Sequence, residues 1–395
     1  MIAGGRYMRF TMFALLYFAQ GSILGYFTAL NALYLMSHNL SMSQAGLFSA
    51  IALIPLILKI FLGILSDRIS FLGLGHRKPY IIMGLLLQAS MQIVFPFIHP
   101  AESFGWLVFV AFISLTGMAL YDTCTDGLAV DITPESDRSH LQGIMVAGRA
   151  LGIVLIAALV GVLSDLTNWT WVFMALAAMT LLPLPFVVAF RIPPRPTERS
   201  FEWQAFRVFK QKPIIAIALL GLISSMITGG ANQLVNPFLK ENFGISFMTA
   251  GFYSAIFGVG MIGGGLTGGK LIRKIGYRRA VITAMAVSLT TVMALALIVS
   301  PGMAWPLLFC FGLSYGYYET TFFATAMSRT HVRIAASMFA ILMAFSNLGS
   351  AIGLAGGGKI SDMIGYRWTF TLFATLNLLV ILLLPALFGK RKSLV

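Results

Sequence analysis

Asp122 and Asp126 are two carboxylates that stand four residues apart inside an apolar stretch of the chain. On a helix, residues four apart are neighbours on one face. Two neighbouring carboxylates in a low-dielectric setting resist double ionisation, so one of them tends to hold a proton. Arg149 would act in the opposite sense, because a cation at hydrogen-bond range keeps a carboxylate ionised. We therefore expect either a proton-binding group or a static Asp122–Arg149 salt bridge that braces two helices.

The composition indicates which elements position these residues. Of the 395 residues, 58% are hydrophobic and 10% are charged, whereas an ordinary soluble domain is about 25% charged. Crossing a bilayer takes about 20 apolar residues per helix, so the chain has room for about twelve such helices with short connections. These figures exclude a disordered chain, a collagen and a disulfide scaffold. They predict an all-α membrane protein that crosses the bilayer many times.

Twelve apolar segments are long enough to cross a bilayer. Their expected bounds are 10–36, 44–66, 80–98, 104–132, 140–164, 170–190, 213–239, 247–270, 280–299, 303–327, 334–358 and 367–389. The first segment is much longer than the apolar part of a signal peptide, so we expect it to be retained. Cys124 and Cys310 both fall in segments, and no metal-binding spacing of cysteine or histidine occurs. We expect neither a metal nor a cofactor.

The basic residues predict an orientation. Twenty-seven Lys and Arg against 13 acids give a formal net charge of +14. With the N-terminus placed in the cytoplasm, 22 of these bases fall on the cytoplasmic side and 3 on the other, while Lys59 and Arg149 lie within segments. This asymmetry predicts that both termini are cytoplasmic. The excess of basic residues is then explained by the orientation of the chain in the membrane. We therefore expect no nucleic-acid partner.

The chain also repeats itself at a constant offset of 197 residues. Pairs related by this offset include Asp122 with Glu319, Gly152 with Gly349, Asp165 with Asp362 and Trp171 with Trp368. A polar, proline-containing connection separates the two copies. We therefore predict a bundle of six segments at 1–190, a cytoplasmic linker at 191–212 and a second bundle of six at 213–395. Duplicated halves with a site between them are typical of alternating-access transporters.

A short glycine-and-acid motif recurs once for each group of three segments. Its copies are Gly63 with Ser66 and Asp67, Gly161 with Ser164 and Asp165, Gly269 with Arg273 in place of the acid, and Gly358 with Ser361 and Asp362. The first copy, followed by Arg68 and the basic pair Arg77 and Lys78, resembles the cytoplasmic loop motif of the major facilitator superfamily. The resemblance covers essentially the whole chain. It implies two pseudo-symmetric six-helix bundles and a substrate site near the membrane midplane.

A narrower resemblance covers residues 122–152. It is similar to the muropeptide permease branch and to the folate–biopterin and acetyl-coenzyme A transporters, and it assigns no substrate. Gly148 is followed by Arg149, so the Gly-Pro motif of antiporters is absent. This weakens a drug-antiporter interpretation without excluding antiport.

Depth singles out three ionisable residues. At ~1.5 Å per helical residue, Asp122, Arg149 and Glu319 lie about 12 to 15 Å from the cytoplasmic ends of their segments, close to the midplane. Glu319 occupies the repeat position of Asp122, whereas the counterpart of Arg149 is Ser346. Glu319 thus has no repeat-related partner, which favours a functional role. For Lys59 we expect snorkelling toward the cytoplasm.

Further polar side chains are expected to line the site, with interfacial anchoring or hydrogen bonding between helices as the alternative. They are Gln20, Tyr26, Tyr121, Asn232, Gln233, Asn236, Tyr315, Tyr318 and Asn347. Tyrosines together with amides suit a sugar or another ring-containing solute.

The resemblance also implies a gate on the cytoplasmic side. A carboxylate there can face the positive N-terminus of a neighbouring helix and nearby arginines when that side closes. The expected gate residues are Asp67, Arg68, Arg77, Asp131, Arg138 and Arg273. The alternative is that these are solvated loop charges, which contribute little energy.

Together these patterns predict a secondary transporter, and not an enzyme, in the inner membrane of a bacterium. Protonation of Asp122, Asp126 or Glu319 would be coupled to movement of a small or medium organic solute. The expected partners are that solute, protons and the lipid bilayer, and the chain is expected to act as a monomer. Two alternatives stay open: an uncoupled facilitator, and a non-transporting sensor or scaffold on the same fold.

Overall fold

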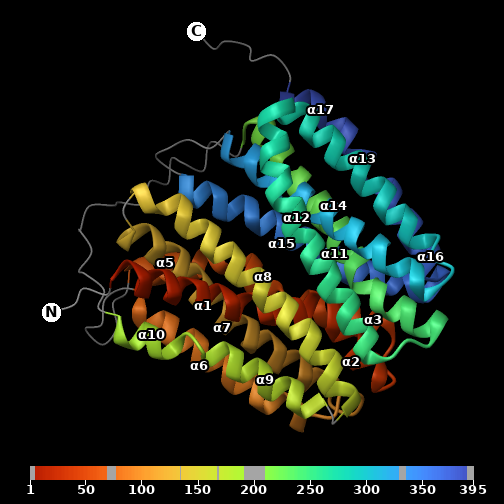
Figure 1. Cartoon of the computed structure of the whole chain (residues 1–395), viewed down its shortest axis with the longest axis horizontal. Helices are drawn as coiled ribbons and strands as arrows, with labels where there is room; N and C mark the ends of the chain where they lie inside the picture. The colour runs from red at the N-terminus through yellow and green to blue at the C-terminus, as the bar shows by residue number, and fades with distance from the viewer. Residues whose placement is uncertain are drawn as a thin grey trace.

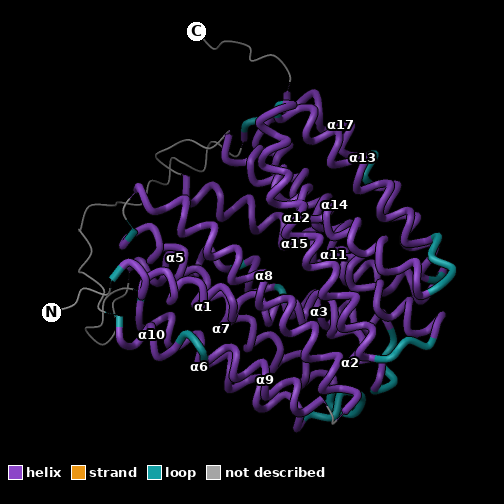
Figure 2. The backbone as a smooth tube through the Cα atoms, in the orientation of Figure 1, coloured by secondary structure: helices purple, strands orange, loops and turns teal. Residues whose placement is uncertain are grey.

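The computed structural model describes residues 5–68, 77–133, 135–166, 169–190, 210–328 and 335–388. Within these ranges the chain is helical almost throughout and contains no strand (Figure 2). The elements up to residue 190 are α1 (Arg6–Gly25), the π-helix η1 (Tyr26–Leu30), α2 (Asn31–Ser37), α3 (Met42–Ala52), α4 (Ile54–Ile57), α5 (Lys59–Arg68), α6 (Lys78–Val94), the 3-10 helix η2 (Phe95–Phe97), α7 (Phe104–Ile132), α8 (Glu135–Leu166), α9 (Trp169–Leu181) and α10 (Leu184–Ala189). The later elements are α11 (Lys212–Phe243), α12 (Phe247–Ile275), α13 (Tyr277–Ala296), α14 (Pro301–Ser328), α15 (Ala335–Ile364), α16 (Tyr366–Leu376) and α17 (Leu379–Phe388).

The helices coincide with the predicted apolar segments. By length and composition, eight helices of the described chain can cross a membrane: Lys78–Phe97, Phe104–Ala129, Trp169–Ala189, Lys212–Phe243, Phe247–Ile272, Tyr277–Ala296, Ile341–Ile364 and Tyr366–Phe388. The predicted segments 10–36, 44–66, 140–164 and 303–327 are helical as well, although they are not among these eight.

The predicted segment 44–66 is not a single helix. Turns at Leu53 and Leu58 divide it into α3, α4 and α5, and Pro55 lies in the short middle piece. Proline has no N–H to donate, so it interrupts the helical ladder of this segment, and the turn at Leu58 interrupts it again. The carbonyl of Leu56 accepts a hydrogen bond from Nδ2 of Asn347 in α15, at 3.0 Å.

The helices form two groups in chain order (Figure 1). Helices α1 to α10 lie together, and helices α11 to α17 lie together beside them, with α8 against α12 and α3 against α15. We call the side on which α1 begins and α17 ends the terminal side. The side on which α9 and α12 begin is the distal side. The two groups meet at the distal side and spread apart toward the terminal side, where α10 and α17 lie far from each other (Figure 1).

The groups share part of their core. The larger hydrophobic core extends across both, from Phe13 in α1 to Phe370 in α16, and a smaller core surrounds Phe322 within the second group. The division of the chain at 191–212 stays a prediction, because residues 191–209 lie outside the described ranges.

Repeat-related glycines bring helices into backbone contact in both groups. A Cβ on Gly152 in α8 would lie 2.2 Å from the carbonyl oxygen of Phe18 in α1. Its repeat mate Gly349 in α15 would place a Cβ 2.1 Å from the carbonyl oxygen of Leu222 in α11. Only glycine permits so close an approach. The two halves therefore use the same device to fix repeat-related helix pairs, α8 on α1 and α15 on α11.

Gly353→Ala should lower the thermal unfolding midpoint of the purified protein, because its Cβ would lie 2.1 Å from the carbonyl oxygen of Met226 in α11. Overpacking of this kind costs about 1–3 kcal/mol. Gly356→Ala, three residues further along the same helix, is the matched control, since nothing lies within 4 Å of its added Cβ. An equal midpoint in the two variants would contradict the packing described here.

Candidate functional site

Asp122 is buried at the centre of the first group and already has its partners. It is 3% exposed. Its Oδ1 accepts a hydrogen bond from Nε2 of Gln20 at 2.6 Å, and its Oδ2 forms an ion pair with Nζ of Lys59 at 3.5 Å. The expectation that Lys59 snorkels toward the cytoplasm is wrong. The ammonium points into the protein because a buried carboxylate needs a cation more than the ammonium needs water.

Asp126 lies one turn further along α7 and faces the same helix, α1. Its Oδ1 accepts a hydrogen bond from the hydroxyl of Tyr17 at 2.5 Å. Tyr17 and Gln20 are three residues apart on α1, so one face of α1 contacts both carboxylates. The two acids thus share a helix face, as their spacing predicts. Their surroundings differ, since Asp122 has a cation in contact and Asp126 has a neutral hydroxyl.

Arg149 lies on α8, where the two groups meet, and it does not form the expected salt bridge with Asp122. Among the described residues it has no ion pair, and its Nε is buried without a hydrogen-bond partner there. The charged or ionisable groups that act on its guanidinium at longer range are, strongest first, Glu319 and Tyr315, followed by Tyr17 and Asp122. Glu319 and Tyr315 belong to α14 of the second group, whereas Tyr17 and Asp122 belong to the first group.

Glu319 on α14 is partly exposed and has no hydrogen bond or ion pair to any described residue. Ser346, the repeat counterpart of Arg149, instead shares a hydrogen bond of 2.6 Å with Ser225 within the second group. The second half thus offers Glu319 no cation at that position. Glu319 and Arg149 come from opposite halves, and Glu319 is the strongest charged neighbour of Arg149.

The other predicted lining residues divide into two sets. The Tyr315 side chain interacts electrostatically with both Arg149 and Glu319. Asn347 bridges the two groups, because its Nδ2 donates a hydrogen bond to the carbonyl of Leu56. Tyr26 begins the π-helix η1, which packs against α11, and its buried hydroxyl has no partner among the described residues. A π turn inside an α-helix often marks a functional position.

The remaining candidates are placed by contacts or burial within one group of helices. Asn236 donates to Oγ of Ser254 at 2.7 Å within the second group. The backbone N and Cβ of Tyr121 face Gly84 of α6, and Tyr318 belongs to the smaller core around Phe322. Asn232 is buried in α11. For these four residues, the alternative of packing or hydrogen bonding between helices accounts for the contacts seen.

Most of the predicted gate lies outside what the structure describes. The side chains in question are those of Asp67, Arg68, Asp131, Arg138 and Arg273. Arg77 is described and buried, and its guanidinium packs directly against Gly127 of α7, where a Cβ would lie 2.0 Å from Nη1. The gate therefore stays a prediction.

The distal side is closed by contacts between the two groups. The backbone N–H of Ser43 and its Oγ both donate to Oδ2 of Asp362, at 2.7 and 2.5 Å. Ser43 lies in the first turn of α3, where unpaired N–H groups and the helix dipole favour a carboxylate. Asp362 belongs to the fourth copy of the repeated motif, and Gly358 of the same copy lies against the carbonyl of Met42. We call Ser43, Met42, Gly358 and Asp362 the distal latch.

Sequence reasoning missed the latch and the role of Tyr17. Taken alone, Asp362 has the sequence context of a solvated loop charge. The recurrence of its motif was the one feature that could have indicated a structural role. Tyr17 lies three residues before Gln20, so helical spacing alone would have placed both on one face.

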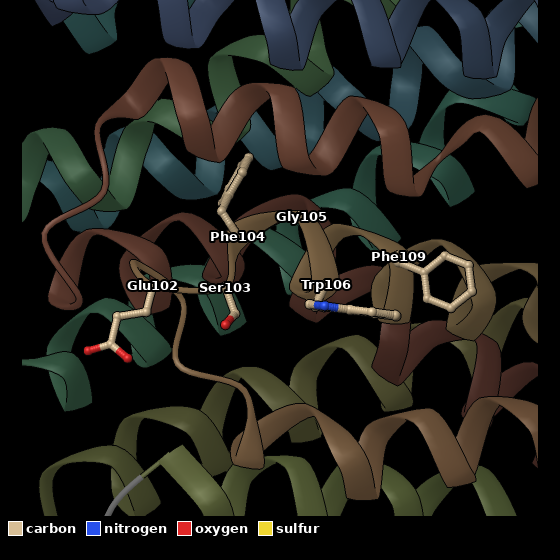
Figure 3. Close-up of a pocket in the computed structure, with 6 residues that line it drawn as sticks. All are labelled: Glu102, Ser103, Phe104, Gly105, Trp106 and Phe109. Atoms are coloured by element: carbon tan, nitrogen blue, oxygen red, sulfur yellow. The ribbon is translucent and has the colours of Figure 1, made fainter.

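A surface hollow at the start of α7 is separate from these groups. It is lined by Glu102, Ser103, Phe104, Gly105, Trp106 and Phe109 (Figure 3). Trp106 and Phe109 are exposed. Exposed aromatic rings near the end of an apolar helix suit the interface between membrane and water, and none of the central charged residues reaches this hollow.

Comparison with known proteins identifies the family of the chain. Residues 10–340 match the family model described as Major Facilitator Superfamily. The chain belongs to the major facilitator superfamily. With its many apolar helices, it is an integral, multi-pass membrane protein. The narrower likeness to the muropeptide permease branch stays a prediction.

Among curated relatives, the synaptic vesicular amine transporter of Homo sapiens is 24% identical over 358 residues, which is 85% of this chain and 65% of that protein. The chain thus spans just under two thirds of that relative's length. The staphylopine export protein of Staphylococcus aureus is 28% identical over 162 residues, covering 40% of this chain and 39% of that protein.

Among solved structures, the nucleoside transporter NupG has a TM-score of 0.78 at 14% identity, covering 96% of this chain and 100% of that one. A bacterial homologue of the human lysosomal transporter Spinster, in an inward-facing and occupied conformation, has a TM-score of 0.72 at 16% identity, covering 96% and 95%. At these identities the likeness shows the fold.

Lys59→Met should lower the thermal unfolding midpoint strongly, because it leaves the Asp122 carboxylate buried without its cation. Removing one partner of a buried ion pair costs about 3 kcal/mol or more. The double variant Lys59→Met with Asp122→Asn should recover much of the loss, since the amide needs no counterion. A double variant no more stable than Lys59→Met would show that the pair does not govern stability.

Ser43→Cys combined with Asp362→Cys should form a disulfide under mild oxidation, because the native side chains are in direct contact across the distal side. Each single variant, which retains the native Cys124 and Cys310, is the control. The measurement is the reducible mobility shift on a denaturing gel after cleavage within residues 191–212. The latch assignment is wrong if the double variant leaves the two halves unlinked.

Proposed function

We propose that this protein is a secondary transporter that moves a small or medium organic solute by alternating access. The observation that carries the proposal is the central charge arrangement. Arg149 of the first group has a buried Nε with no partner among the described residues, its strongest charged neighbour is Glu319 of the second group, and the distal side is closed by the latch. A site built from both halves and closed on one side is what alternating access requires.

The proposal includes twelve membrane spans with both termini in the cytoplasm. The eight apolar helices and the four further helical segments support the span count. The 22 bases on the cytoplasmic side against 3 on the other support the orientation. With this orientation the terminal side is cytoplasmic, and the closed latch makes the conformation inward-facing. The short connections between segments fit a bacterial inner membrane.

We further propose that transport is coupled to protons. Three acids, Asp122, Asp126 and Glu319, share the centre with two bases, Lys59 and Arg149. Full ionisation would leave one uncompensated negative charge in a low-dielectric region, which is costly. A single proton removes that charge. Asp126 and Glu319 are the better carriers, because neither has a cation in direct contact.

The relatives support an organic solute. Three of the similar proteins are described as an amine transporter, a staphylopine exporter and a nucleoside transporter. They share no single substrate class, so they support transport more strongly than any one solute. An uncoupled facilitator and a non-transporting sensor remain the alternative functions.

The test is uptake into proteoliposomes with an imposed pH gradient, screened over amines, nucleosides, sugars, amino acids and short peptides. We expect the native protein to concentrate at least one solute and to lose this ability when the gradient is dissipated. Asp126→Asn and Glu319→Gln should each abolish concentrative uptake and its pH dependence. Glu102→Gln, an exposed acid of the distal surface, should behave as the native protein does.

The alternatives give different results in the same assay. A facilitator would equilibrate the solute whatever the gradient. A sensor would bind a solute without any flux. If both acid variants stay concentrative and equally pH-sensitive, the coupling assignment is wrong.

A further inference from the structure

The short helices α4 and α5 lie between the two groups of helices. Both of them pack against α15 of the second group and against α7, the helix of the first group that carries Asp122. Leu56 in α4 is buried at this boundary. A movement of α15 relative to α7 therefore changes the packing of both short helices.

A polar contact holds this segment on each side. On the side of the second group, Nδ2 of Asn347 in α15 donates a hydrogen bond of 3.0 Å to the carbonyl oxygen of Leu56. On the side of the first group, Nζ of Lys59 forms an ion pair with Oδ2 of Asp122 at 3.5 Å. Leu56 and Lys59 are only three residues apart in the chain, so the two contacts are separated by about one helical turn.

The backbone between Leu56 and Lys59 is tied together by its own hydrogen bonds. The N–H of Leu58 donates to the carbonyl of Ile54 at 3.1 Å, and the N–H of Phe61 donates to the carbonyl of Leu58 at 3.0 Å. These bonds cross the turn at Leu58 and connect α4 to α5. A displacement of the Leu56 carbonyl is therefore passed on to the start of α5, where Lys59 lies.

We propose that Asn347 is a positioning residue for the Lys59–Asp122 ion pair. Its hydrogen bond from the second group fixes the carbonyl of Leu56, and the bonded turn that follows keeps the ammonium of Lys59 beside the carboxylate. This hydrogen bond exists only while α15 lies against α4. The charge compensation of Asp122 inside the first group then depends on where the second group lies.

The dependence matters because Asp122 has few other sources of compensation. Its carboxylate is 3% exposed, and its second oxygen accepts a hydrogen bond from the neutral amide of Gln20 at 2.6 Å. Asp126, one turn along α7, is another acid. If α15 moves away and Lys59 withdraws, the buried carboxylate needs a new positive charge, and a proton supplies it in the smallest volume. The energetic link is a property of the folded chain, whereas its use in proton coupling rests on the proposed transport function.

The test is a double-mutant cycle on the purified full-length protein, read from the thermal unfolding midpoint. Asn347→Leu removes the hydrogen-bond donor with little change in volume. Its midpoint shift is measured in the native chain and in the double variant Lys59→Met with Asp122→Asn, which has no ion pair to position. We expect the shift to be smaller by about half or more in the double variant, because only the hydrogen bond is then lost.

Asn236→Leu is the matched control. Asn236 also belongs to the second group, but its Nδ2 donates to Oγ of Ser254 within that group, at 2.7 Å. Its midpoint shift should be the same with and without the ion pair. If Asn347→Leu gives no folded protein, Asn347→Ser, whose side chain is too short to reach the carbonyl of Leu56, is measured in the same way.

Two results would overturn the inference. Equal shifts of Asn347→Leu in the two backgrounds would show that its hydrogen bond joins the groups without positioning Lys59. A difference just as large for Asn236→Leu would show that the coupling is not specific to this bond. Either result leaves the transport function standing, since the cycle needs no solute. A coupled cycle in a protein that moves none of the solutes screened in proteoliposomes would overturn the transport function and leave the positioning role standing.

Discussion

A charge held away from water must be compensated by an opposite charge or by hydrogen bonds, and this constraint organises the centre of the molecule. Asp122 meets it inside the first group through Lys59 and Gln20, and Asp126 meets it in part through Tyr17. Arg149 and Glu319 have no ion pair among the described residues, and the strongest charged neighbour of Arg149 is Glu319 of the opposite group. Their energies therefore depend on how the two groups are placed, which makes them sensitive to anything that moves the groups or fills the space between them.

The distal latch also stabilises a carboxylate by hydrogen bonds, here on the closed side of the molecule. Asp362 caps the first turn of α3 with two hydrogen bonds, so its carboxylate is stabilised by a helix of the opposite group. Because the motif recurs after the second segment of each group of three, duplication supplied related groups to both faces of the molecule. The first copy, at Gly63, Ser66 and Asp67, belongs to the terminal side by its position in the chain, although its Asp67 side chain lies outside the described part.

Motion of the groups as units requires that each be tightly packed within itself. Gly152 and Gly349 provide this by bringing α8 onto α1 and α15 onto α11 at backbone contact. In α12, Gly264 does the same against the carbonyl of Leu313 in α14. The interrupted segment of α3, α4 and α5 lies instead at the boundary between the groups, where Asn347 bonds to the carbonyl of Leu56. Rigid helix pairs beside a broken boundary helix are well suited to rocking of one group against the other.

The sequence by itself determined the helical segments, the repeat and the central acids, because long apolar runs must be helical in a membrane and charges within them are rare. It also placed Asp122 and Asp126 on one face, since helical spacing is local. It did not determine that Lys59 pairs with Asp122, or that Tyr17 bonds to Asp126. Spacing along one helix sets the depth and face of a side chain. Its partner depends on which helices pack together, and that is decided by glycine contacts such as Gly152 with Phe18, between residues far apart in the chain.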